Sequence, residues 1–190
     1  TADLGLAYVS YFQSLNNMNR DEGFMTDVYP ALTFLSDTKQ YDYYFALYNM
    51  LVNRLFSHRF YQKAQDEAAD MYLQAKKLQQ PLGMAMALRV QGQIYYKLNL
   101  YDKAYASLQE GREICPSYQE NLNTFMTAQS LCEWLIMTCI KTEAFEELLP
   151  LADHYGDMLA YWNEKGWYDP SGHCPVTYHS LRSIAFLKVD

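Results

Sequence analysis

The segment at residues 85–118 carries the pattern that most limits what this chain can fold into. Apolar and small residues recur in it at helical spacing, first before residue 98 and again after residue 102, which predicts two amphipathic helices joined by a turn. We expect the small Gly92 to let the partner helix approach closely, and Asp102 to cap the second helix. Pro116 should end that helix, and Ala104, Leu108 and Gly111 should face back toward the first one. The marker residues are Leu88, Gly92, Tyr95, Ala104, Leu108 and Pro116.

These residues and their spacing resemble the tetratricopeptide repeat, whose 34-residue pattern runs W-x2-L-G-x2-Y, then A-x3-F and then P. The segment departs from that pattern at four positions, which are Leu88 for Trp, Gln91 for Leu, Leu108 for Phe and Gly111 for Ala. The resemblance implies an all-α fold, a right-handed solenoid of antiparallel helix pairs. It also implies that the chain binds other molecules and is not an enzyme, because stacked repeats present extended binding surfaces.

The aromatic residue that opens the turn at Tyr101 has counterparts at Phe24, Tyr61 and Phe145, at intervals of 37, 40 and 44 residues. These intervals exceed 34, so we expect longer helices or loops than in the ideal repeat. The pattern predicts helices near residues 3–18, 22–37, 41–57, 60–79, 82–98, 101–114, 118–141, 143–164 and 175–188, about nine in all. Residues 1–190 would form one solenoid, with looser pairs near 3–37, 41–79 and 118–164 and a partial pair at 175–190. The absence of an initiating Met and the apolar C-terminal end indicate a segment of a longer chain.

The composition narrows the classes of partner. A formal charge of −7 and a pI near 5.0 disfavour nucleic acid, because an acidic surface repels phosphates. No apolar run is long enough to span a bilayer, and no basic cluster predicts direct contact with a membrane surface.

Cys132 and Cys139 stand seven residues apart on one predicted helix, about 10 Å along its axis, which is too far for a disulfide. We expect free buried thiols, although Cys115 and Cys174 lie in predicted turns where a bridge is open.

The resemblance also implies a binding groove. In that family the second, fifth, ninth and twelfth positions of each first helix point into the concave face. On 85–118 these positions are Met86, Arg89, Gln93 and Tyr96, and the same count in the neighbouring pairs adds Asn49, Asn53, Phe56, Glu133 and Met137. Amides, one Arg, one Glu and aromatic surface suit a peptide, whereas the paired lysines of a carboxylate clamp are missing. The alternative is that these side chains are solvated or packed against their neighbours.

The long break at 165–175 holds the other candidate chemistry. His173, Cys174 and His179 are acceptable metal ligands, with Asp169 and His154 nearby, but their spacing fits no zinc template. We therefore expect a solvated loop there, and we expect no cofactor. The catalytic motifs G-x-S-x-G and H-E-x-x-H and the phosphate-binding loops are absent from the sequence, so no catalytic residue is predicted.

The sequence therefore predicts a non-catalytic scaffold whose partner is a protein or peptide. Its overall character resembles the periplasmic, ligand-sensing regions of bacterial sensor kinases and regulators. The alternatives are a cytoplasmic adaptor or peptide-responsive regulator, and a small-molecule or metal site near residues 169–179. A homodimer is one way to cover the apolar surface of the C-terminal helix.

Overall fold

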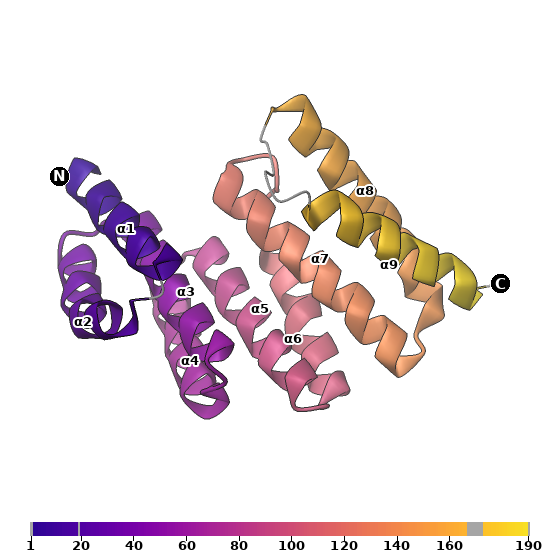
Figure 1. Ribbon diagram of the computed structural model, residues 1–190, viewed down its shortest axis with the longest axis horizontal. Helices are drawn as coiled ribbons and strands as arrows, with labels where there is room; N and C mark the ends of the chain where they lie inside the picture. The colour runs from indigo at the N-terminus through magenta and orange to yellow at the C-terminus, as the bar shows by residue number, and fades with distance from the viewer. Residues whose placement is uncertain (1, 19, 167–172, 190) are drawn as a thin grey trace. The chain divides into compact units, whose positions relative to one another are not determined.

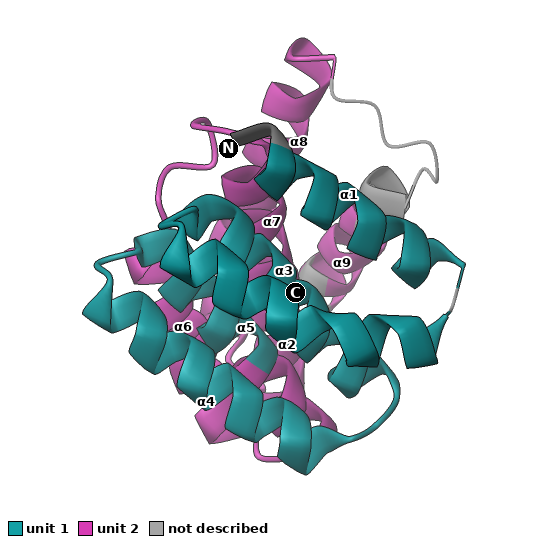
Figure 2. Cartoon of the chain, turned by 90° about the vertical axis from the view of Figure 1, so that its left-hand side faces the viewer, with its two compact units in different colours: residues 1–90 teal, residues 91–190 magenta. Residues whose placement is uncertain are grey.

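The computed structural model describes residues 2–18, 20–166 and 173–189, and all regular structure in these ranges is helical (Figure 1). Side chains are described in these ranges except at residues 2, 3, 173–177, 185, 188 and 189. The elements are α1 (Ala2–Asn17), α2 (Asp21–Asp37), α3 (Tyr41–Ser57), α4 (Tyr61–Lys77), α5 (Pro81–Lys97), α6 (Tyr101–Ile114), α7 (Leu122–Thr142), the 3-10 turn η1 (Phe145–Glu147), α8 (Leu148–Glu164) and α9 (His173–Val189). The chain divides into two compact units, unit 1 at Thr1–Val90 and unit 2 at Gln91–Asp190 (Figure 2), so α5 begins in one unit and ends in the other.

The predicted all-α fold is confirmed for the described residues, and most helix ends lie within two residues of the predicted ones. The largest differences are at the start of α8, predicted at 143 and lying at Leu148 after the turn η1, and at the start of α7, predicted at 118 and lying at Leu122. Asn121 fixes this start, because its side-chain Oδ1 accepts hydrogen bonds from the backbone N–H groups of Asn123 and Thr124 at 2.9 and 3.1 Å. The Thr124 hydroxyl accepts in turn from the backbone N–H of Asn121 at 3.1 Å, which completes a capping box.

The prediction that Asp102 caps α6 is wrong. The cap residue is Leu100, without a side-chain cap bond, and the helix begins at Tyr101. The backbone N–H of Leu100 donates to the carbonyl oxygen of Tyr95 at 2.9 Å, so the turn closes too early for Asp102 to precede the helix. Asp102 lies in the first turn of α6 instead, where its carboxylate interacts favourably with the helix dipole.

Four tight turns recur every 20 residues and set a 40-residue repeat. Lys39, Arg59, Gln79 and Asn99 each adopt the left-handed conformation, with φ between 54° and 63°. At each of these turns the next residue donates its N–H five residues back, as Gln40 does to Leu35 at 2.9 Å, which is the Schellman arrangement. Two 17-residue helices with two three-residue turns therefore make one repeat, which explains the interval of 40 residues between the aromatic residues Tyr61 and Tyr101.

In unit 1, α1 packs on α2, α2 on α3 and α3 on α4, and α1 also packs on α3. The buried face of α4 consists of Ala64, Ala68, Met71 and Ala75, at the i, i+4, i+7, i+11 spacing of one helix stripe. These small side chains allow close packing: a Cβ built on Gly83 of α5 would lie 2.8 Å from the Phe45 ring and 3.0 Å from the Ala75 Cβ. Each helix therefore buries its stripe against its neighbours in the order of the chain, as expected for a helical repeat.

Unit 2 follows the same plan. α6 packs on α7, α7 on α8, and α9 on both α7 and α8, so α9 takes the place of a next first helix. Ala104, Leu108 and Gly111 form the buried face of α6, as predicted. Gly92 gives the predicted close approach, because a Cβ at this position would lie 2.4 Å from the Cγ of Leu108.

Among the described residues, no helix combines the length and the apolar character needed to cross a bilayer.

Candidate functional site

Three of the predicted groove residues meet in unit 1. Asn49 and Asn53 lie one turn apart on α3, and Arg89 approaches them from α5. One terminal nitrogen of Arg89 donates to the Asn49 Oδ1 at 2.9 Å and to the Asn53 Oδ1 at 3.0 Å. We call these three residues the Asn–Arg cluster. It joins the first helices of two successive pairs, which is where the repeat register predicted a groove.

Inside the cluster the two asparagines also bind each other. The Asn53 Nδ2 donates to the Asn49 carbonyl oxygen at 2.7 Å and to the Asn49 Oδ1 at 2.9 Å. The Asn49 Nδ2 donates to no described residue, and both asparagines are half-buried, so this donor stands where a bound molecule can reach it. Burial lowers the pKa of Arg89 to about 10, which leaves the guanidinium charged at neutral pH. The cluster thus combines a held cation with an amide donor.

The two apolar groove candidates of unit 1 differ in exposure. Phe56 is half-buried, and its ring centroid lies 5.7 Å from that of Tyr61. Met86 is only 5% exposed and belongs to the core. Met86 therefore packs in the core, at a position that the repeat register assigns to the groove.

The remaining groove candidates lie in unit 2. Gln93 is buried, whereas Tyr96, Glu133 and Met137 are half-buried. The Tyr96 ring packs edge-on against Tyr101 and against Trp134 of α7, at centroid distances of 5.5 and 5.3 Å. Sequence reasoning missed Trp134, although it directly follows the candidate Glu133.

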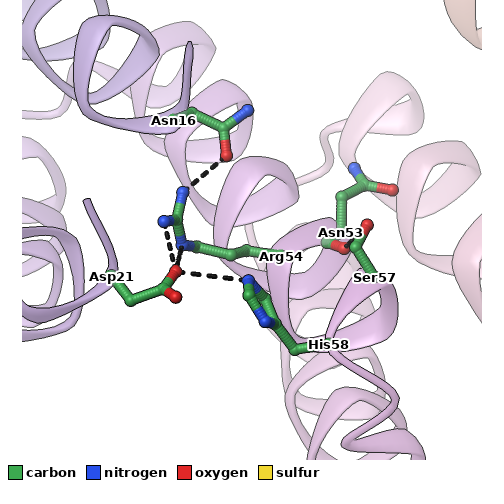
Figure 3. Close-up of polar contacts among 6 residues, drawn as sticks. All are labelled: Asn16, Asp21, Asn53, Arg54, Ser57 and His58. Carbon is green, nitrogen blue, oxygen red and sulfur yellow. Dashed lines mark hydrogen bonds and ion pairs between the residues drawn. The ribbon is translucent and has the colours of Figure 1, made fainter. Parts of the chain in front are cut away.

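A second polar cluster of unit 1, around Arg54, was not predicted (Figure 3). Arg54 is 4% exposed, and its Nε donates to an Asp21 carboxylate oxygen at 2.7 Å while another nitrogen donates to the Asn16 Oδ1 at 2.7 Å. The same Asp21 oxygen lies 3.2 Å from the His58 Nε2, and the guanidinium stands 4.8 Å from the centre of the Phe24 ring. Arg54 therefore ties α3 to α1 and to the start of α2.

The Arg54 cluster has a structural role. A buried guanidinium is costly unless it is paired and hydrogen-bonded, and Asp21 and Asn16 satisfy it. Figure 3 shows that the neighbouring Asn53 side chain points away from it. The two clusters therefore use opposite sides of α3, one to hold helices together and one to line the predicted groove.

Tyrosines and carboxylates form another network, which links α2, α3 and α4. Tyr29 donates to a Glu67 oxygen at 2.6 Å, and the Tyr48 hydroxyl lies 3.0 Å from the other Glu67 oxygen and 2.8 Å from an Asp70 oxygen. Burial and then these bonds raise the pKa of Tyr29 and Tyr48, and burial raises the pKa of Tyr44 to about 12. These phenols stay protonated at neutral pH and serve as donors that hold three helices together, not as catalytic bases.

The three described thiols are not activated as nucleophiles. Cys115, Cys132 and Cys139 are free, as expected, and burial raises their pKa values to about 11, about 12 and about 11. A nucleophilic cysteine needs the opposite shift.

The candidate metal ligands cannot be assembled from the described residues, among which no group of three His, Cys, Asp or Glu side chains could hold a metal ion. Asp169 and the side chains of His173 and Cys174 lie outside the described residues. The His179 ring is exposed and lies 5.1 Å from the Tyr178 ring.

Comparisons with known proteins identified no matching family, no similar curated protein and no similar solved structure. The class of the protein therefore follows from the fold, which is an all-α helical repeat.

Proposed function

We propose that this chain is a non-catalytic, peptide-binding helical repeat and that the Asn–Arg cluster is part of its binding surface. The observation that carries the proposal is the meeting of Asn49 and Asn53 of α3 with Arg89 of α5. The repeat register assigns these positions to the groove independently of the contact between them. Buried and half-buried polar groups on the first helices of successive pairs suit an extended ligand that crosses from one pair to the next.

The hydrogen-bond pattern supports a peptide as that ligand. Arg89 holds the side-chain oxygens of both asparagines, which fixes how their amides are turned. The Asn49 Nδ2 is then the donor left for a bound chain, and a peptide carbonyl oxygen is its natural partner. The half-buried Phe56, one turn further along α3, offers apolar surface for a ligand side chain.

A selection from a random peptide library displayed on phage tests this proposal. The enriched peptides are then titrated by calorimetry against the native protein and the Asn49→Ala variant. Loss of one well-placed neutral hydrogen bond should weaken binding by about 0.5–1.5 kcal/mol, roughly two- to tenfold. Removal of both amides, in Asn49→Ala/Asn53→Ala, should weaken it further.

Gln62→Ala is the matched control, because Gln62 is an exposed amide on the second helix of the same pair. It should leave peptide affinity unchanged. Circular dichroism establishes that each variant is folded at the titration temperature. The proposal is refuted if no peptide is enriched, or if the enriched peptides bind the double variant as tightly as the native protein.

We also propose, from the resemblance to periplasmic sensor regions, that peptide binding is read out as a conformational change within a signalling protein. Small-angle scattering with and without an enriched peptide tests this part separately. Superimposable profiles at saturating peptide would leave a plain adaptor as the better assignment.

A further inference from the structure

Unit 2 contains a hollow of about 290 Å³ that the Asn–Arg cluster does not include. It lies where the connection between α6 and α7 meets α7 and α8. Its lining residues are Arg112, Cys115, Pro116, Ser117, Tyr118, Ala128, Cys132 and His154. We call it the α6–α8 hollow. Its volume is at the lower end of ligand sites, which suits a small molecule.

The walls of the hollow are held in place. The Tyr118 ring packs edge-on against His154 and Tyr161, at centroid distances of 5.9 and 5.5 Å. The Tyr161 hydroxyl donates to the Gln119 carbonyl oxygen at 3.0 Å, which ties the connection to α8. The Cys132 thiol donates to the Leu151 carbonyl oxygen at 3.2 Å and joins α7 to α8. The α6–α8 hollow is therefore largely preformed, which limits the entropy lost when a ligand binds.

Among the described lining residues, Arg112 is the one that carries a formal charge. It lies in the last turn of α6, is exposed, and forms no hydrogen bond or ion pair with any described residue. The charge of Arg112 acts across the hollow. Burial lowers the pKa of His154, and Arg112 lowers it further. Burial raises the pKa of Cys132, and Arg112 opposes that rise. A guanidinium beside this hollow with no partner among the described residues is suited to bind an anion, and its planar fork matches a carboxylate.

The other lining groups do not compete for this charge. Both thiols are protonated at neutral pH, because burial raises their pKa values to about 11 for Cys115 and about 12 for Cys132. His154 is neutral, because its pKa lies below the ordinary value of 6.5. The remaining surface is aromatic and weakly polar, from Tyr118, Pro116 and the two thiols. Such a surface favours an apolar or aromatic group over a strongly hydrated one.

We propose that the α6–α8 hollow binds a small carboxylate with an aromatic or apolar body, with the carboxylate on Arg112 and the body against Tyr118, His154 and Cys132. This site is independent of the proposed peptide surface. It would make the chain responsive to a small molecule as well as to a protein partner.

Benzoate is the probe, and benzamide and benzylamine are its neutral and cationic counterparts. Titrations are followed by NMR of protein labelled with ¹³C in the rings of tyrosine and histidine. Benzoate at millimolar concentration should shift the resonances of Tyr118 and His154 in a saturable way, and both counterparts should bind at least about tenfold more weakly. Equal affinity for benzamide would overturn the assignment, as would the absence of saturable shifts at these two rings.

Two variants test whether Arg112 supplies the charge that binds benzoate. Arg112→Gln should weaken benzoate at least about tenfold, whereas Arg112→Lys should retain part of the affinity. Lys141→Gln, which removes an exposed cation from the far end of α7, is the matched control and should bind benzoate as the native protein does. Unchanged affinity in Arg112→Gln, with the same circular dichroism spectrum as the native protein, would refute the proposal.

Two further measurements test the ligand class and the role of His154. His154 faces Arg112 of α6, Tyr118 of the connection, Cys132 of α7 and Asp157 on its own helix. As the pH falls through its pKa it gains a positive charge, so benzoate should bind more tightly, and bound benzoate should raise the pKa of His154. Weaker binding at the lower pH would contradict a carboxylate in the hollow. A peptide with a C-terminal Phe that binds Arg112 more tightly than benzoate would overturn the choice of a free small molecule.

Discussion

Gly92→Ala is the sharpest test of how the repeat packs, because it adds one carbon where two helices are closest. The new Cβ would lie 2.4 Å from the Cγ and 2.6 Å from a Cδ of Leu108. Leu108 is fully buried, and its Cγ is a branch point near the backbone, so it cannot swing aside as the end of a long side chain could. Overpacking of this kind costs about 1–3 kcal/mol, while Ala gains about 0.5–1 kcal/mol over Gly in a helix interior. We expect a net loss of about 1–2 kcal/mol in the free energy of unfolding.

The assay can report on unit 2 alone. Residues 1–90 contain no tryptophan, and Trp134 and Trp162 lie in the unit that contains Gly92. Urea unfolding followed by tryptophan fluorescence therefore measures unit 2, and circular dichroism at the helix band follows the whole chain. Gly23→Ala is the matched control, because its Cβ would meet only Leu15 at 3.8 Å, an ordinary contact. It should raise stability by about 0.5–1 kcal/mol through helix propensity.

A double-mutant cycle identifies the cause. Leu108→Ala removes the three atoms nearest to a Cβ on Gly92, at a cost of about 2–5 kcal/mol for the lost burial. In that background Gly92→Ala should change sign and become stabilising, which gives a coupling energy of about 2 kcal/mol. Gly92→Ala that stabilises the native protein, or a coupling near zero, would refute the reasoning that Leu108 is seated on Gly92.

Three further changes test other parts of the structure. Asp21→Asn removes the charge that faces the buried Arg54 and should lower the free energy of unfolding by about 1–2 kcal/mol. The loss is moderate because the Asp21 side chain is 51% exposed. An unchanged urea midpoint would contradict this prediction. Gln79→Gly should raise the melting temperature, since glycine relieves the left-handed φ of 54°, whereas Gln79→Val should lower it; equal melting temperatures would argue against this turn. Burial, and then Arg112, lower the pKa of His154, so below about pH 6.5 the unfolded chain binds more protons and stability is lost as the pH falls. His154→Gln should therefore lose less stability than the native protein between about pH 7.5 and about pH 5.5 in urea titrations, and an identical loss would contradict the lowered pKa.

Part of the fold was predictable because it is local. The buried stripe of α6 and the close approach at Gly92 follow from helical spacing and from the size of one residue. The turns were harder, because Lys39, Arg59 and Gln79 adopt the left-handed conformation where a glycine would be the expected signal. Without that signal the sequence does not indicate the 20-residue spacing of the turns, and the pattern resembles a 34-residue repeat with longer intervals.

The candidate sites divide in the same way. The repeat register predicts Asn49, Asn53 and Arg89 as groove residues, and the fold brings them together. The register does not predict Arg54, because its partner Asp21 lies 33 residues away and no periodicity connects them. A register assigns positions to a helix face, but it does not identify the residue that faces them from another helix.

Helical spacing in the sequence was enough to predict consecutive amphipathic helices and the buried stripe of α6. Those properties depend on residues within a turn or two of each other, and hydrophobic spacing encodes them directly. Which polar groups meet, and in which direction their pKa values shift, follows instead from how the helices pack. The Asn–Arg cluster, the Arg54 pairing and the α6–α8 hollow each require side chains from separate helices to come within a few ångströms. That proximity is set by packing and turn geometry across the unit, not by any one segment.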